Sequence, residues 1–298
     1  MGVSIALEGS EGAGKSLLGR LLTMHLEQTT NFPVRFGREP GGTPLGEYIR
    51  GILKGESFKD MDPLASVFLF SAQRAELFSK VDMPFLRDNP RGVMIKDRSW
   101  LSTVALQVAE GANPEFVDFI QEPFKRIPDK FAIIDIPVEE TVVRMAAEQM
   151  YASNREIDWR DKQKQEILSK IRENYLHFAL ENPGKCIVLD CFDDPWIKSA
   201  QIKFEIVEFF IKGEGGQMAC EKERELIAEF RNEAKRIVDE DGEKKVLRLF
   251  DIEERRRVVE ETRRELGYPG REELRAKMHD DWRALGLEGF SSGRERGK

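Results

Sequence analysis

Cysteine, histidine, tyrosine and tryptophan are all scarce in this sequence of 298 residues, which holds three, three, four and four of them. The cysteines are Cys186, Cys191 and Cys220. Their spacing matches no zinc-binding pattern, and three cysteines cannot all pair within one chain. We therefore expect free thiols in a reducing cytosol, and hence a cytoplasmic protein. The histidines stand far apart, which gives no reason to expect a histidine metal site or base.

Long apolar runs and an excess of positive charge are also absent. No stretch approaches the roughly 18 apolar residues that cross a bilayer, and the N-terminus lacks the basic start of a signal peptide. The formal net charge is −7 and the sequence pI is about 5.4, which argues against a general nucleic-acid-binding protein. We expect no membrane and no nucleic acid among the partners. A hydrophobic fraction of 40% supplies enough material for a core.

The first 212 residues alternate between short apolar runs and helical patterns. The five strand candidates are Val3–Leu7, Pro33–Phe36, Val93–Lys96, Phe131–Ile136 and Cys186–Leu189. The helical patterns between them are Lys15–Glu27, Leu45–Lys54, Pro63–Arg87, Trp100–Glu110, Pro137–Met150 and Asp161–Leu180. Strands that alternate with helices in this way predict an α/β fold, in which a five-stranded parallel sheet carries helices on both faces.

The composition changes after a glycine-rich linker at residues 213–216. Residues 213–298 contain 22 acidic and 20 basic residues, yet they keep a periodic apolar stripe that includes Val258, Val259 and Leu266. This pattern predicts a charged helical extension of two or three amphipathic helices, with a break at residues 267–270. The stripe must be buried on the first domain, on the extension's own helices or in a dimer. We therefore divide the chain into a domain at 1–212 and an extension at 213–298.

A phosphate-binding loop stands directly after the first strand candidate. Residues 9–16 read GSEGAGKS, which fits the pattern G-x-x-x-x-G-K-[ST] and opens a helical segment. The glycines let backbone N–H groups face phosphate oxygens, and the helix N-terminus adds partial positive charge. Lys15 is expected to reach the terminal phosphates of ATP, and the Ser16 hydroxyl to bind Mg²⁺. The residues expected to line ATP here are Gly9, Glu11, Gly12, Ala13, Gly14, Lys15, Ser16 and Leu17.

Further motifs follow the loop in a fixed order. Residues 38–43 read REPGGT, residues 46–50 read GEYIR, residues 68–75 read FLFSAQRA, and residues 97–107 read DRSWLSTVALQ. In this order and spacing, residues 1–212 resemble the thymidylate kinases. The resemblance implies a P-loop nucleoside monophosphate kinase that transfers a phosphoryl group from ATP in line, with Mg²⁺ as cofactor and dTMP as the favoured acceptor. It also implies a homodimer.

The resemblance assigns roles on the acceptor side. Phe70 would stack on the thymine ring, and Arg74, four residues later, would donate to a thymine carbonyl oxygen. Arg50 and Arg98 would hold the acceptor 5′-phosphate, with Arg98 also catalytic beside Lys15. Asp97 would act on the magnesium side. The remaining acceptor candidates are Glu39, which could orient Arg38 or a sugar hydroxyl, and Ser102, Thr103, Leu106 and Gln107.

The phosphate loop contains no arginine, so the resemblance implies that a flexible lid supplies one. The lid is expected at about residues 145–160, with Arg155 as its catalytic arginine and Arg160 as the second choice. Such an arginine stabilises the transferring phosphoryl oxygens. Arg144, just before the lid, is expected to contact ATP.

Two departures from the family pattern bear on the acceptor. Ser99 and Leu106 stand where the family carries tyrosines, which weakens the expectation of strict deoxyribose and thymine selection. One alternative is a kinase for another pyrimidine monophosphate, such as dUMP. The other is a non-catalytic nucleotide-binding module whose helical extension contacts a partner.

Overall fold

The computed structural model describes residues 1–55, 61–151, 165–193, 198, 202 and 252–287. Its sheet has five strands in the order β2-β3-β1-β4-β5, and every pair of neighbours is parallel. The strands are β1 (Val3–Glu8), β2 (Val34–Arg38), β3 (Val93–Asp97), β4 (Lys130–Asp135) and β5 (Cys186–Asp190). Each overlaps a predicted strand, so the prediction of a five-stranded parallel sheet is confirmed.

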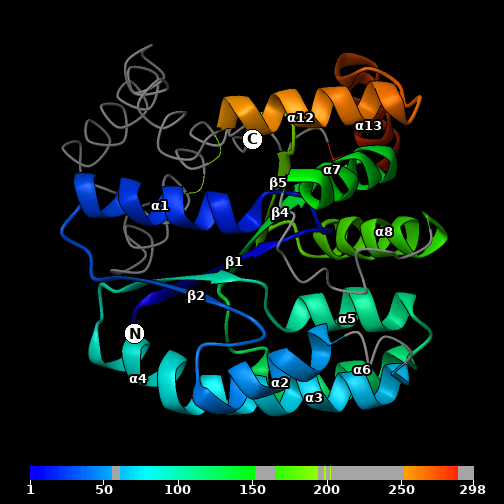
Figure 1. Cartoon of the computed structure of the whole chain (residues 1–298). Helices are drawn as coiled ribbons and strands as arrows, with labels where there is room; N and C mark the ends of the chain where they lie inside the picture. The colour runs from blue at the N-terminus through cyan, green and yellow to red at the C-terminus, as the bar shows by residue number, and fades with distance from the viewer. Residues whose placement is uncertain (56–60, 152–164, 194–197, 199–201, 203–251, 288–298) are drawn as a thin grey trace.

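Helices cover both faces of this sheet, as the alternation of elements predicted. Figure 1 shows α1 and α12 above the sheet and α2 to α6 below it. None of the described helices is long and apolar enough to cross a membrane. The helices are α1 (Lys15–Thr29), α2 (Pro44–Lys54), α3 (Pro63–Leu77), α4 (Met83–Asp88), α5 (Trp100–Ala109), α6 (Pro114–Gln121), α7 (Val138–Tyr151), α8 (Gln165–Glu181), α12 (Ile252–Glu265) and α13 (Arg271–Leu285).

The helical pattern differs from the prediction in two places. The single helix expected at Pro63–Arg87 consists of α3 and α4, joined by a π-helical segment at Phe78–Asp82. Helix α6 was not predicted, although residues that can begin a helix stand at its start. The Asn113 side chain accepts a hydrogen bond from the Phe116 N–H at 2.8 Å, and proline occupies the first turn.

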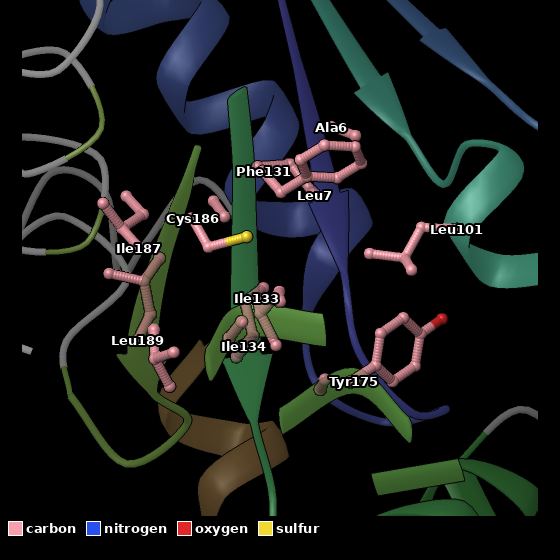
Figure 2. Close-up of a cluster of buried hydrophobic side chains, with 14 of the residues drawn as sticks. Ala6, Leu7, Leu101, Phe131, Ile133, Ile134, Tyr175, Cys186, Ile187 and Leu189 are labelled. Carbon is pink, nitrogen blue, oxygen red and sulfur yellow. The ribbon is translucent and has the colours of Figure 1, made fainter. Parts of the chain in front are cut away.

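The core lies between the central strands and the helices on either side. All residues of β1, β3 and β5 are buried, as expected for parallel strands covered on both faces. Figure 2 shows aliphatic side chains of β4 and β5, such as Ile133 and Leu189, gathered together. In the same view the hydroxyl oxygen of Tyr175 points away from Ile133 and Ile134. That hydroxyl group instead donates a hydrogen bond to Glu8 at the end of β1.

Two of the three cysteines lie inside this core. Cys186 and Cys191 are buried free thiols, and burial raises the pKa of each to about 12. A thiol with so high a pKa stays protonated at neutral pH and is a poor nucleophile. Cys220 lies outside the described residues.

The helical extension packs against the sheet through α13. The expected break is confirmed, since α12 ends at Glu265 and α13 begins at Arg271. Leu274, Met278 and Trp282 of α13 belong to the same buried cluster as the strands. Leu266, which was expected to be part of the buried apolar stripe, is 46% exposed. The extension is therefore held by a face of α13 that periodicity did not single out.

Trp282 also anchors α13 through a polar contact. Its indole N–H donates to Asp135 Oδ2 at the end of β4 over 2.7 Å, and Arg172 makes two hydrogen bonds of 2.8 and 2.9 Å to the same carboxylate. A fully buried aromatic that also satisfies a buried carboxylate is a strong link between sequence-distant segments. The α13 helix thus belongs to the folded unit that carries the sheet.

Replacing Trp282 with alanine should lower the free energy of unfolding by about 3–5 kcal/mol, because the change leaves a cavity and removes a donor from Asp135. Urea denaturation of the full chain measures this loss. His177→Ala, which removes an exposed i,i+4 partner of Glu181, is the control and should change stability by less than about 0.5 kcal/mol. Equal stability of the Trp282 variant and the native chain would show that α13 is not docked.

Candidate active site

The phosphate loop joins the carboxyl end of β1 to the first residue of α1. Gly9 has a φ of 136°, and a Cβ there would lie 2.5 Å from the Ile134 carbonyl oxygen, so no larger residue fits. Gly14 caps α1 with a φ of 89°. These backbone conformations turn the chain sharply into the helix, whose free N–H groups and partial positive charge attract a phosphate.

Lys15 is buried against its own loop. Its ammonium donates to the carbonyl oxygens of Gly9 and Ser10 over 3.0 and 2.7 Å. Burial, with the nearby positive charge of Arg98, lowers the pKa of Lys15 to about 8. A desolvated ammonium beside the loop interacts strongly with any phosphate bound there, because few water molecules screen the charge.

Ser16 and Asp97 meet at the point where α1 begins and β3 ends. The Ser16 hydroxyl donates a hydrogen bond to Asp97 Oδ2. A hydroxyl and a carboxylate are oxygen ligands, and Mg²⁺ prefers one or two protein oxygens completed by phosphates and water. The described residues hold no group of three or more acidic, histidine or cysteine side chains arranged for a metal. The pair therefore fits a magnesium ion that reaches the site with a nucleotide.

Arg98 follows β3 and turns toward the phosphate loop. It is the only described non-glycine residue with positive φ, at 74°, a strained conformation that often marks functional sites. Its Nη1 lies 3.4 Å from the Gly9 carbonyl oxygen and donates to Ser102 Oγ over 3.0 Å. Its Nη2 pairs with Glu11. Burial opposes the charge, but Glu11 and neighbouring acidic groups raise the pKa of Arg98 above its ordinary value.

Glu11 is the acidic partner that holds Arg98 from the loop side. The positive charge of Arg98 lowers the pKa of Glu11 to about 2. The carboxylate therefore stays ionised throughout the neutral range. The Glu11–Arg98 pair links the phosphate loop, which is assigned to ATP, to the segment after β3, which is assigned to the acceptor.

Glu8 is a site residue that the sequence patterns did not reveal. It closes β1, is fully buried, and accepts hydrogen bonds from Ser99 at 2.6 Å, Ser102 at 2.5 Å and Tyr175 at 3.2 Å. Burial raises its pKa despite these hydrogen bonds. The signal that points to it is a glutamate that ends an apolar strand just before the glycine loop. Ser99, which stands where the family carries a tyrosine, thus donates a hydrogen bond to Glu8.

Arg74 lies at the centre of a second buried polar cluster. Its Nε pairs with Glu39 Oε2 at 2.7 Å, and its terminal nitrogens donate to Thr103, Gln121 and the Ser99 carbonyl over 2.6–3.0 Å. Among the described residues, four of its five N–H groups thus have acceptors within the protein. Arg74 therefore holds this cluster together, and its contact with a thymine carbonyl oxygen stays a prediction.

Glu39 contacts two buried cations and not Arg38, one of the two groups that it was expected to orient; its contact with a sugar hydroxyl stays a prediction. It pairs with Arg74 and with Lys96, whose ammonium lies 2.8 Å from Oε1, and these cations keep the pKa of Glu39 low against the effect of burial. Arg38, which Glu39 was expected to orient, pairs instead with Glu47 at 3.2 Å. Glu39 therefore joins the buried cluster, away from Arg38.

The other acceptor candidates come from the elements around this cluster. Phe70 is half-buried on α3, one turn before Arg74, and Gln107 and Leu106 are buried on α5. Arg50 on α2 donates to the Pro40 carbonyl oxygen over 3.0 Å. The predicted residues thus gather on α2, α3 and α5, which lie on one side of the sheet (Figure 1).

Arg144 on α7 contacts the phosphate loop from a different helix than the acceptor candidates. Its Nη1 donates to the Gly12 carbonyl oxygen over 3.2 Å, so α7 contacts the loop directly. Arg155 and Arg160, and with them the proposed lid arginine, lie outside the described residues.

A phosphate-binding loop after the central strand of a β2-β3-β1-β4-β5 parallel sheet defines a P-loop nucleotide-binding protein. Within this class the chain belongs to the thymidylate kinase family, whose sequence model matches residues 7–194. It is 34% identical over 191 residues to a thymidylate kinase of Chlamydia felis, covering 62% of this chain and 88% of that protein. It is 31% identical over 221 residues to one of Pelotomaculum thermopropionicum, covering 71% and 97%.

A solved structure supports the same assignment. The crystal structure of thymidylate kinase from Ehrlichia chaffeensis matches with a TM-score of 0.53 and 26% sequence identity, covering 70% of this chain and all of that one. The chain is therefore a kinase, and the family match ends at residue 194, before α12 and α13 begin.

Lys15→Ala should abolish phosphoryl transfer from ATP and leave the fold intact, because its ammonium donates its hydrogen bonds to loop carbonyl oxygens. We expect kcat/KM to fall about 10³-fold or more, as for the loss of a preorganised charged donor. A coupled assay of ADP release measures the activity, and far-UV circular dichroism checks the fold. Turnover within tenfold of the native rate would contradict the role of Lys15.

Proposed function

We propose that this chain phosphorylates thymidylate, converting dTMP and ATP into dTDP and ADP. Family membership supports a kinase of this kind, and the residues assigned to the two substrates support the direction of transfer. ATP would bind at the loop between β1 and α1, and dTMP between α2, α3 and α5. The two groups of residues meet at Arg98, which belongs to the acceptor side and contacts the loop.

The contact of Arg98 with the phosphate loop is the observation that carries this proposal. Its guanidinium lies 3.4 Å from the Gly9 carbonyl oxygen, and Ser102 holds it from the side of α5. An acceptor phosphate paired with Arg98 would therefore lie beside the terminal phosphate of ATP in the loop. Holding two reacting groups in this way supplies much of the rate of a transfer reaction.

The transfer itself needs no covalent intermediate on the protein. An oxygen of the acceptor phosphate attacks the γ-phosphorus, and the bond from that phosphorus to the β–γ bridging oxygen breaks, so the γ-phosphoryl group moves directly. Lys15 and Arg98 offset the negative charge on the transferring group. Ser16 and Asp97 would hold Mg²⁺, which neutralises charge on the ATP phosphates when bound. Arg155 of the lid remains the proposed additional cation.

A second candidate acceptor is another pyrimidine monophosphate, favoured by Leu106. This residue is buried on α5 and offers no hydroxyl group where the family carries a tyrosine. A leucine can exclude a 2′-hydroxyl only by its bulk, and apolar contacts discriminate weakly against a small added group. The one N–H of Arg74 that has no acceptor among the described residues would contact the same edge of thymine and of uracil.

Steady-state kinetics with a panel of nucleoside monophosphates tests the proposal. We expect the highest kcat/KM for dTMP, a loss of about 10- to 200-fold for dUMP, because a single methyl group is worth about 1–3 kcal/mol in a pocket, and low activity with purine nucleotides. A higher kcat/KM for UMP or dUMP would favour the second candidate. Tight ATP binding without ADP release for any acceptor would contradict a kinase.

We also infer a homodimer through an apolar surface on α2, α3 and α6. These helices lie together below the sheet (Figure 1) and expose several large apolar side chains. Tyr48 is 79% exposed and Phe119 72% exposed, while Phe68 and Phe116 contact each other edge to face with ring centroids 6.0 Å apart. Exposed apolar side chains on neighbouring helices are typical of an interface, and a second copy of the chain is the commonest occupant of such a face. The exposed residues of the patch are Leu45, Tyr48, Ile52, Leu64, Phe68, Phe116 and Phe119.

Phe119→Asp should convert the dimer into a monomer, because the change would bury a carboxylate in an apolar interface. Light scattering coupled to size-exclusion chromatography measures the mass. Leu266→Asp, which changes an exposed leucine outside the patch, is the control and should leave the mass unchanged. An unaltered dimer in the Phe119 variant, or a monomeric native chain, would contradict this interface.

A further inference from the structure

We propose that helices α12 and α13 of the C-terminal extension position Arg144 against the phosphate loop, and so set the affinity for the donor nucleotide. This inference rests on the proposed function, since it concerns the ATP side of the same site. It assigns a role to a segment that begins after the family match ends. Arg263 is the positioning residue through which α12 acts, and Phe192 is the one through which α13 acts.

Arg144 is the point on which both links converge. Besides its bond to the Gly12 carbonyl oxygen, Nη2 donates to the Cys191 carbonyl oxygen over 3.3 Å, just after β5. Gly12 itself leaves little room, because a Cβ on it would lie 3.1 Å from the Arg144 Cβ. A shift of Arg144 would therefore displace the phosphate loop at Gly12.

The first link is a buried carboxylate between two arginines. Glu140 on α7 accepts from Arg144 Nε with Oε1 at 2.5 Å and pairs with Arg263 of α12 through Oε2 at 2.6 Å. Glu140 and Arg263 are both almost completely buried. Removing Arg263 takes away one of the two cations beside this buried carboxylate, which forces Glu140 and Arg144 to rearrange.

The second link is an aromatic ring between two guanidinium groups. Phe192, just after β5, is buried, with Arg144 5.8 Å from its ring centroid and Arg271 of α13 5.7 Å away. Arg271 also donates to the Phe192 carbonyl oxygen. The ring thus contacts one cation from α7 and one from α13, so α13 helps to define the surface on which Arg144 rests.

Further ion pairs hold α13 to the segment that carries Phe192. Arg275 pairs with Asp190 at 2.7 Å and with Asp193 at 2.5 Å, and His279 Nε2 lies 2.9 Å from Asp190 Oδ2. These bonds bracket Phe192 in sequence, so the loop after β5 cannot move independently of α13.

The geometry favours an effect on ATP over an effect on the acceptor. Both links end at α7, at the loop after β5 and at Gly12, all on the donor side. The partners of Arg74 come instead from the segments after β2 and β3 and from α5 and α6, and these two helices lie below the sheet (Figure 1). Loss of the positioning contacts should thus weaken the binding of ADP and leave the binding of dTMP nearly unchanged.

Isothermal titration of the full chain with ADP alone, and separately with dTMP alone, tests the inference. Arg263→Met should raise the Kd for ADP about tenfold, a usual size for coupling between sites, and change the Kd for dTMP by less than twofold. Arg263→Lys should restore part of the affinity for ADP. The control Lys277→Met removes an exposed α13–α7 ion pair to Glu139 and should change neither constant.

A double-mutant cycle shows whether Arg263 acts through Arg144. In an Arg144→Ala background, Arg263→Met should cause no further loss of ADP affinity, whereas independent effects would add. If Arg263→Met lowers the yield of folded protein, Phe192→Leu addresses the second link and should also weaken ADP binding selectively.

Three results would overturn the inference. They are an unchanged Kd for ADP in folded Arg263→Met and Phe192→Leu variants, equal losses for ADP and dTMP, and additive effects in the cycle. If the native chain binds both ADP and dTMP, each of these results leaves the proposed function uncontradicted. A native chain that binds no ADP would remove both the proposed function and the inference.

Discussion

The placement of Arg98 against the phosphate loop is the constraint on which the rest of the site depends. The register of β1 and β3 pairs Leu7 with Asp97, and the Arg98 N–H then donates to the Leu7 carbonyl oxygen over 3.1 Å. The sheet thereby brings the residue after β3 to the glycines after β1. The strained backbone at Arg98 is maintained because Glu11, Ser102 and Tyr175 all hold its guanidinium.

Most of the fold could be predicted from the sequence, because its strands are continuous apolar runs bounded by turn residues. The five strands and the helices that follow them appear where the runs and the periodicity placed them. The π-helical segment at Phe78–Asp82 could not be predicted, since an extra residue per turn depends on packing and leaves no clear periodic signal. Helix α6 is short and opens with Asn113 and Pro114, which read equally well as a turn.

The candidate site was predictable where it consists of local motifs and not where it consists of long-range contacts. The loop with Lys15 and the pair Ser16–Asp97 follow from local pattern and strand order. The burial of Glu8 and the near saturation of Arg74 depend on residues 25–167 positions away, such as Tyr175. The docking of α13 is of the same kind, because a charged helix gives no hint that Trp282 reaches Asp135. Side-chain partners at such distances are set by the whole fold.

A bisubstrate inhibitor gives the most direct test that one continuous site serves both substrates across Arg98. The compound would join adenosine and thymidine through a chain of five phosphates, long enough to span the loop and the acceptor residues. The account predicts one molecule bound per chain and inhibition that is competitive against both ATP and dTMP. Inhibition competitive against only one of them, with the other still binding to the inhibited protein, would contradict it.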